Sequence, residues 1–268
     1  MTDQTPLGQA SSYPDRYSPD LLYAIARTES RAALGLGAEL PFAGCDLWNV
    51  WELTWLDDAG QPQVAIAELS VPASSANIIE SKSLKLYLGS FAMSRFTSAD
   101  DVADAMRDDL CACTDSDVIV NLQTGGGTKA IEDFPGQCID GLTVQCDQHD
   151  VDAGLLAAGE DIVEEALHSH LLRSLCPVTN QPDIGSVLVS YAGPKIDPAG
   201  LLQYIVSYRK HNDFHETCVE RMFMDISARC QPEKLTVFAC YQRRGGIDIN
   251  PFRSNFENTA PNTRLWRQ

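Results

Sequence analysis

The sequence predicts an α+β protein in which antiparallel sheets are backed by paired helices. Segments 47–55 and 63–71 are rich in Trp, Val and Ile, and the Asp-Asp-Ala-Gly turn at 57–60 between them predicts a hairpin. Helical periodicity follows at 80–91 and 98–111. The second half of the chain shows a similar succession without obvious sequence identity. We therefore expect two modules, each with its helices on one face of a sheet.

The first module is expected to have the order β-β-α-α-β-β. In its second helix Ser98 is a suitable N-cap residue. The following apolar residues share one helical face: Val102, Ala105, Met106 and Leu110. Segments 117–122 and 142–146 are predicted as short strands. Residues 1–40 form an N-terminal arm, in which 21–34 is expected to include a helix.

The second module is expected to begin with a helix at 160–175, because apolar residues recur there at helical spacing. A strand is predicted at 186–191. Asp197 and Pro198 make a good N-cap and N1 pair for a helix that ends near 211. Asp213 opens another helix with an apolar face, and 234–242 alternates as a strand.

Composition restricts the partners. The 268 residues carry a formal net charge of −17, which repels nucleic acid phosphates and anionic lipid alike. No apolar run approaches the roughly 20 residues that span a bilayer, and the polar N-terminal stretch does not resemble a secretory signal. We therefore expect a cytoplasmic protein with a small-molecule substrate, without direct nucleic acid or membrane binding.

The cysteines and histidines give little support for a metal. Nine cysteines in a chain without an export signal predict free thiols, most of them in the core. Cys111 and Cys113 form a C-x-C pair, and His211 and His215 are four residues apart, as in some zinc sites. The pairs lie in different halves, however, and no C-x-x-C accompanies either. We expect no metal.

The most informative segment is 175–186, which holds a thiol and a carboxylate seven residues apart. Pro177 and Pro182 exclude a continuous helix, so the loop can turn Asp183 back toward Cys176. A carboxylate that takes the thiol proton and later returns it to a substrate nitrogen would make a catalytic pair. For a cysteine and an aspartate at this spacing taken in isolation, a buried cysteine and a turn-forming aspartate would be the favoured explanation.

Three further motifs accompany this loop: ESKSLK at 80–85, HNDFHE at 211–216 and RRGGIDINPFRSN from Arg243. In this order the four segments resemble the NADPH-dependent 7-cyano-7-deazaguanine reductases, in their long form with two modules per chain. The resemblance runs from about Leu40 to the C-terminus. It implies two tunnelling-fold (T-fold) modules with sites at module interfaces. We place the modules at 41–150 and 151–268, each with an expected sheet and helix pair.

The resemblance also implies a reaction. Cys176 would add to a nitrile carbon and form a covalent thioimide, while Asp183 supplies the proton to nitrogen. Two NADPH molecules would then reduce the nitrile to 7-aminomethyl-7-deazaguanine, a step of tRNA queuosine biosynthesis. We expect the enzyme to be a homodimer.

Substrate recognition is assigned by the resemblance to two carboxylates. Glu80 and Glu216 would accept hydrogen bonds from the ring N–H and the exocyclic amino group of a deazaguanine. The resemblance adds neighbouring substrate contacts: Ile79, Ser81 and His215. Taken alone, Glu80 fits a glutamate at a helix N-terminus, and His215-Glu216 fits an exposed first helical turn.

The sequence does not support a Rossmann-type NADPH site, because no G-x-G-x-x-G follows a strand. The resemblance implies cofactor contacts at Ser81, Lys82, Arg244 and Gly245. Lys85, Arg243 and Arg253 are further candidates for phosphate binding, although solvated salt bridges explain Lys85 and Arg253 equally well. The glycines at 125–127 lack the Lys-Ser or Lys-Thr of a phosphate loop, so we expect a mobile loop there.

Three other functions fit parts of this pattern. A zinc-dependent cyclohydrolase-like enzyme of the same fold would use Cys176, His211 and His215 as metal ligands. A cysteine-dependent nitrile hydrolase would let water attack the thioimide in place of hydride. A non-catalytic purine-binding module would leave Cys176 with ordinary thiol reactivity.

Overall fold

The computed structural model describes residues 14–126 and 130–268 of the chain. Its strands are β1 (Ala24–Ala26), β2 (Ala43–Leu56), β3 (Pro62–Pro72), β4 (Asn77–Ile79), β5 (Ile119–Gln123), β6 (Ile131–Glu132), β7 (Gln137–Cys138), β8 (Ala158–Leu175), β9 (Pro182–Ile196), β10 (Lys234–Tyr241), β11 (Ile247–Ser254) and β12 (Arg264–Leu265). The α-helices are α1 (Arg27–Ala33), α2 (Ser81–Ser90), α3 (Ala99–Thr114), α4 (Pro198–Ser207) and α5 (His215–Cys230), and short 3-10 helices lie at Pro19–Leu21, Ala153–Leu155 and Tyr208–Lys210.

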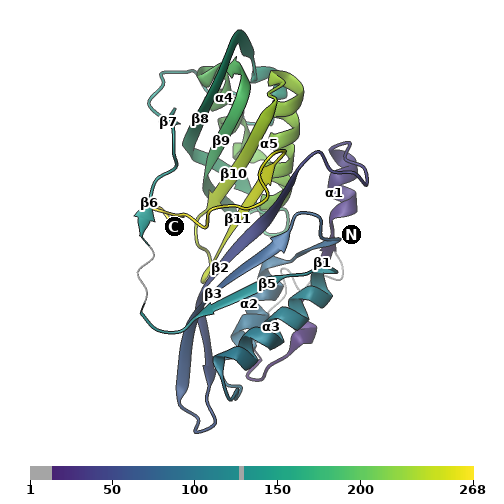
Figure 1. Ribbon diagram of the computed structural model, residues 1–268, viewed down its shortest axis with the longest axis vertical. Helices are drawn as coiled ribbons and strands as arrows, with labels where there is room; N and C mark the ends of the chain where they lie inside the picture. The colour runs from purple at the N-terminus through teal and green to yellow at the C-terminus, as the bar shows by residue number, and fades with distance from the viewer. Residues whose placement is uncertain (1–13, 127–129) are drawn as a thin grey trace.

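One sheet of eight strands runs through the molecule in the order β5-β3-β2-β11-β10-β9-β8-β7. Its pairs are antiparallel except for the short parallel pair of β7 with β8. The C-terminal strand β11 lies between β2 and β10, so it joins the strands of the first half to those of the second (Figure 1). The active-site candidates lie near this junction.

The helices cover one face of the sheet in two groups (Figure 1). Buried side chains of α2 and α3 pack with those of β2 and β3, and buried side chains of α4 and α5 pack with those of β8, β9 and β10. This confirms the predicted α+β class with antiparallel strands and paired helices. In the described parts of the chain, no helix is long and apolar enough to cross a membrane.

Most predicted elements are present. The hairpin is β2 and β3, and α3 begins with a capping box in which Ser98 and Asp101 bond each other's backbone N–H. Asp197 caps α4 by accepting hydrogen bonds from two backbone N–H groups of its first turn. The expected helix within 21–34 is α1, which is shorter than that range. The glycine loop at 125–127 lies partly outside the described residues, so its prediction is untested.

Three features differ from the sequence-based predictions. Residues 160–175 form no helix, because β8 pairs with β9 along nearly its whole length. A bulge between Ser169 and Leu172 interrupts the alternation of the strand. The strand expected at 142–146 is absent. Strand β11 was not predicted, since Pro251 is unusual in a central strand. With β8 as a strand, both halves begin with a hairpin followed by two helices.

A network of buried ion pairs connects the two halves of the chain. Arg253 of β11 contacts Asp46 of β2 at 2.8 Å and Glu220 of α5 at 2.9 Å. Arg27 and Arg31 of α1 pair with the same two carboxylates. Arg253 is fully buried, with 0% of its side chain exposed, so it is a structural residue and does not bind cofactor phosphate.

Replacing Arg253 with methionine should lower the free energy of unfolding by about 3–5 kcal/mol, because the Asp46 and Glu220 carboxylates stay buried with fewer partners. Urea denaturation measures this change. Arg107→Met is the matched control, since its pair with Asp104 is on the surface and its loss should leave the transition in place. Equal unfolding midpoints for the two variants would contradict a structural role for the network.

Candidate active site

The Cys176 loop is a tight connection between β8 and β9. Its ends are held by a hydrogen bond from the Cys176 backbone N–H to the Gln181 carbonyl (2.9 Å) and one from the Asn180 N–H to the Cys176 carbonyl (2.9 Å). Asn180 adopts the left-handed conformation at φ 57°, which asparagine tolerates. Asp183 lies opposite Ser174 in the β8–β9 pairing. The hairpin therefore returns the carboxylate to the neighbourhood of the thiol.

The HNDFHE segment docks on the same strand end through its backbone. The Leu175 N–H donates to the His211 carbonyl (2.8 Å), and the Asp213 N–H donates to the Leu175 carbonyl (3.2 Å). His215 then begins α5, and its Nε2 lies 3.5 Å from Oδ2 of Asp183. Its ring packs against Tyr241, with centroids 4.0 Å apart.

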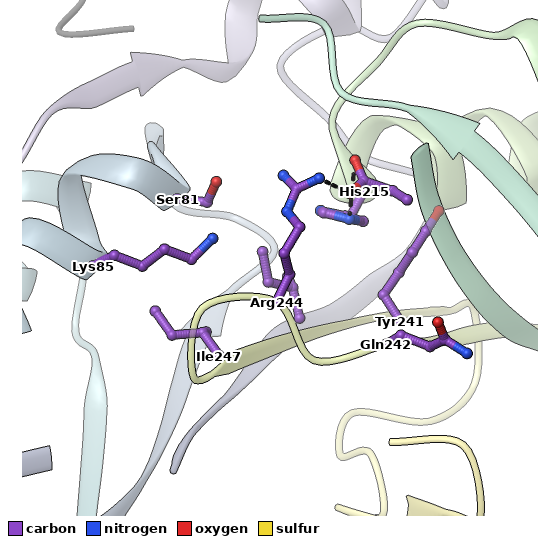
Figure 2. Close-up of a pocket in the computed structure, with 9 residues that line it drawn as sticks. Ser81, Lys85, His215, Tyr241, Gln242, Arg244 and Ile247 are labelled. Carbon is purple, nitrogen blue, oxygen red and sulfur yellow. Dashed lines mark ion pairs between the residues drawn. The ribbon is translucent and has the colours of Figure 1, made fainter. Parts of the chain in front are cut away.

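Arg244 reaches the site from the turn between β10 and β11. Its guanidinium lies 2.7 Å from Oδ1 of Asp183, and Figure 2 shows it between Ser81 and His215. Gly245 follows at φ 62°, and a Cβ there would meet the Lys85 side chain at 3.1 Å. Glycine thus permits both the turn and the close approach of Lys85.

These side chains line two adjoining pockets that share Ser81, Asp183, His215, Arg244 and Ile249. The first also includes Lys85, Tyr241, Gln242 and Ile247 (Figure 2). The second adds Trp48, Ile79, Cys176, Pro177, Asp213, Phe214 and Glu216. The pockets therefore combine residues from the Cys loop, α2, α5, the β10–β11 turn and strands of both halves.

Eight of the residues named as candidates line these pockets: Ile79, Ser81, Lys85, Cys176, Asp183, His215, Glu216 and Arg244. Glu80, Lys82 and Gly245 line neither. The Glu80 carboxylate is buried and caps α2, accepting the backbone N–H of Lys82 (2.9 Å) and of Ser83 (2.7 Å). Its helix-capping interpretation is therefore confirmed, and any contact with substrate would use its remaining lone pairs.

Several pocket residues escaped the sequence analysis. Trp48 and Ile249 come from β2 and β11, and Tyr241 and Gln242 from the end of β10 and just beyond it. Apolar strand residues give no signal of a site, because the same residue types fill the core. Arg243, a predicted phosphate contact, instead lies over the Trp51 ring at 4.5 Å.

The charges around Asp183 keep it ionised. Burial alone would raise the pKa of Asp183, but the hydrogen bond and electrostatic interaction with His215, together with Arg244 and Lys85, lower that pKa below the usual aspartate value. Burial, followed by repulsion from Arg244, lowers the pKa of Lys85. The pocket thus holds one ionised carboxylate, Asp183, and two partly buried cations, Arg244 and Lys85.

Glu216 titrates differently from Asp183. Burial and the Asp46 carboxylate raise the pKa of Glu216 to about 7, against lowering contributions from His215 and Arg27. Glu216 is therefore protonated in acid and becomes a full hydrogen-bond acceptor as the pH rises through neutrality.

Comparison with known proteins is consistent with this site. The family described as "Nitrile reductase, 7-cyano-7-deazaguanine-reductase N-term" matches residues 13–122, and the family "QueF-like protein" matches 182–260. A protein named NADPH-dependent 7-cyano-7-deazaguanine reductase from Paraburkholderia xenovorans is 52% identical over 271 residues, covering 99% of both chains. The chain belongs to the 7-cyano-7-deazaguanine reductase family. The same name is borne by a Burkholderia multivorans protein that is 50% identical, again over 99% of both chains.

Membership of the 7-cyano-7-deazaguanine reductase family confirms the resemblance inferred from the four motifs. NADPH dependence is part of the name of these relatives. Cys176 lies between the two matched family segments. The solved structure of an archaeosine synthase QueF-Like in the apo form is 19% identical, with a TM-score of 0.31, and covers 37% of this chain and 96% of its own.

The metal site required by a cyclohydrolase-like enzyme is not formed by its proposed ligands. His211 lies after a 3-10 helix and pairs with Asp213 at 3.5 Å, while His215 starts the next helix and faces Asp183. Cys176, His211 and His215 do not bring their ligand atoms together within the described residues. All nine cysteines are free thiols, and five of them are buried: Cys45, Cys176, Cys218, Cys230 and Cys240.

Proposed function

We propose that this chain reduces the nitrile of 7-cyano-7-deazaguanine to 7-aminomethyl-7-deazaguanine with NADPH, as a step of queuosine biosynthesis. The observation that carries the proposal is the convergence of Cys176, Asp183, His215 and Arg244 on adjoining pockets. It occurs in a chain 52% identical over its length to a protein named for this activity.

The first step assigned to the chain is covalent capture of the nitrile. Asp183, an ionised carboxylate that lines the same pocket, takes the proton of the Cys176 thiol. The sulfur adds to the nitrile carbon, one C–N π bond breaks, and Asp183 delivers the proton to the nitrogen. The product is a neutral thioimide on Cys176, and Asp183 is a carboxylate again.

Reduction of this thioimide releases Cys176 and completes the amine. NADPH supplies hydride when it is bound, and two molecules are needed for each nitrile. The chain's contribution is to hold the thioimide in a pocket from which Cys176 leaves as thiolate at the imine stage. Solvent supplies the second proton of the amine and the proton that restores the Cys176 thiol, so the bonds are accounted for by thiol, carboxylate, hydride and solvent protons without a metal at the reaction centre.

The cofactor contacts are proposed to be Ser81, Lys82, Arg244 and Gly245, together with Lys85, whose position in the pocket supports its candidacy. Lys85 and Arg244 flank the same pocket, and mutual repulsion contributes to the lowered pKa of Lys85. A phosphate group between them would relieve that repulsion and form charge-assisted hydrogen bonds. This fit supports phosphate binding in a protein that is otherwise strongly acidic.

Substrate recognition is proposed to rest on Glu216 and Glu80, with Ile79, Ser81 and His215 forming the neighbouring wall. Glu216 lines the pocket that contains Cys176. Glu80 is placed at the start of α2, directly between the pocket residues Ile79 and Ser81. We further propose that the enzyme is a cytoplasmic homodimer with modules at 41–150 and 151–268, acting on the free base and not on nucleic acid.

Binding of the nitrile should tighten as the pH rises through about 7, because Glu216 ionises there and becomes an acceptor for the substrate N–H groups. Below that pH, affinity should fall by up to about tenfold per unit. Calorimetry in a Cys176→Ala background measures this without covalent capture. Glu216→Gln should bind weakly and without this pH dependence. An unchanged pH profile in Glu216→Gln would remove Glu216 from substrate recognition.

The function itself is tested by following NADPH absorbance with the purified chain and 7-cyano-7-deazaguanine, while mass spectrometry identifies the product. We expect two NADPH oxidised for each amine formed. Release of an amide or acid without NADPH oxidation would favour a nitrile hydrolase. Tight binding with no product at all would favour a non-catalytic purine-binding module.

A further inference from the structure

A second cluster of reactive side chains lies outside the proposed active site. It is found where the connecting segment, residues 130–157, packs against β8. Cys138, His168 and His170 each bring one ligand atom to within 4.8 Å of the others. Cys138 of β7 is the direct cross-strand partner of His168 of β8. None of the three lines either pocket of the active site.

The neighbours of His168 determine which of its ring nitrogens carries the hydrogen. Its Nδ1 lies 3.1 Å from the carbonyl oxygen of Pro135, which can only accept, so Nδ1 carries the hydrogen. The lone pair is therefore on Nε2. This atom is buried and has no hydrogen-bond partner among the described residues. Metal-binding histidines commonly donate their other ring N–H to a backbone carbonyl in this way.

Two further groups complete the surroundings. The Asp133 carboxylate lies 4.0 Å from Nε2 of His168 and 3.4 Å from Nε2 of His170. Nδ1 of His170 lies 2.8 Å from the Ser186 hydroxyl, which leaves its Nε2 facing Asp133. One thiol, two imidazoles and one carboxylate form a ligand set typical of zinc.

We propose that Cys138, His168, His170 and Asp133 bind a divalent zinc-type ion that fastens the connecting segment to β8. The Asp133 carboxylate is not among the three ligand atoms that lie within 4.8 Å of one another, so the four groups must move closer together to reach tetrahedral contact distances. This proposal departs from the sequence-based expectation of a metal-free protein, and the site lies apart from the proposed reaction centre.

The connecting segment has little regular secondary structure of its own to hold it against β8. Its strands β6 and β7 have two residues each, and it runs along one edge of the molecule near the C-terminus (Figure 1). Gly136 has φ 83°, and a Cβ there would lie 2.1 Å from the Ala166 carbonyl oxygen, so the chain approaches β8 very closely. His170 also contacts Ser186 of β9. Strand β8 continues from His170 to the Cys176 loop, and β9 returns from that loop through Asp183 to Ser186. A bound ion would hold this part of the hairpin.

The test uses the full-length, untagged and reduced chain, dialysed against ZnCl2 and then against metal-free buffer. Elemental analysis should give one zinc per chain, and zinc should raise the melting temperature. Replacing zinc with CoCl2 should give the strong visible bands of tetrahedral cobalt and a thiolate-to-cobalt charge-transfer band.

Three variants identify the ligands. Cys138→Ser changes an exposed side chain and should fold, yet lose zinc and the charge-transfer band. His170→Asn retains an amide near the position of Nδ1 for Ser186 but removes Nε2, and it should also lose zinc. Cys146→Ser, in the same segment, is the control and should keep both. A wild-type chain that retains no zinc, or zinc retained equally by Cys138→Ser and His170→Asn, would overturn the proposal.

Discussion

Cys176→Ala should abolish NADPH oxidation and leave binding of 7-cyano-7-deazaguanine largely intact. The thiol is the nucleophile in the proposed mechanism, while recognition is assigned to carboxylates that the substitution does not touch. The Cys176 side chain is small and lies at a loop, so its loss should not disturb the hairpin, whose ends are held by backbone hydrogen bonds. Steady-state kinetics and calorimetry with the nitrile measure the two effects separately.

Mass spectrometry of the wild-type protein provides the complementary result. Incubation with the nitrile and no NADPH should add one substrate mass to the peptide that contains Cys176. Cys218→Ala is a useful control, because Cys218 is buried and burial raises the pKa of its thiol above the usual value. An adduct on any other cysteine, or full turnover by Cys176→Ala, would refute the assignment.

Asp183→Asn should slow formation of the thioimide by about 10²–10⁴-fold, the usual contribution of a general acid–base group. Asparagine keeps the size of the side chain but cannot take the proton from Cys176 or return it to nitrogen. Single-turnover capture of the nitrile, followed without NADPH, isolates this step from hydride transfer. Substrate affinity should change much less than the capture rate.

Asp213→Asn is the matched control for Asp183, because Asp213 lines the same pocket but pairs with His211. Its capture rate should fall far less. If Asp183→Asn captures the nitrile at the normal rate, Asp183 serves only to position Arg244 and His215. His215, 3.5 Å from Asp183, would then be the leading proton donor.

Local sequence signals predicted the elements whose stability is local. Ser98 and Asp197 mark helix starts through their own hydrogen bonds, and the Asp57–Gly60 turn defines a hairpin. Strand β8 could not be predicted in this way, because its pairing with β9 and its bulge depend on a partner strand. Because residues 160–175 were predicted as a helix, the sequence analysis did not bring His168 and His170 together. His168 and His170 point apart on a helix, but on a strand they face the same side.

The residues of the candidate site were largely predictable, but their convergence was not. The motifs containing Cys176 and His215 are separated by β9, α4 and a short 3-10 helix, and two backbone hydrogen bonds of Leu175 bring them together. Backbone pairing of this kind leaves no trace in side-chain identity. For the same reason Trp48 and Tyr241, which line the pockets, could not be distinguished from core residues.

The position of β11 has a consequence for biosynthesis. This strand joins β2 to β10, yet it follows both of them in the chain, so it leaves the ribosome after them. Until then the nascent chain carries two unpaired strand edges, at β2 and β10, which invite association with other chains. Arg244 and Gly245 arrive equally late. The pocket is therefore complete only once β11 has been synthesised, and truncation before β11 yields two open half-sheets.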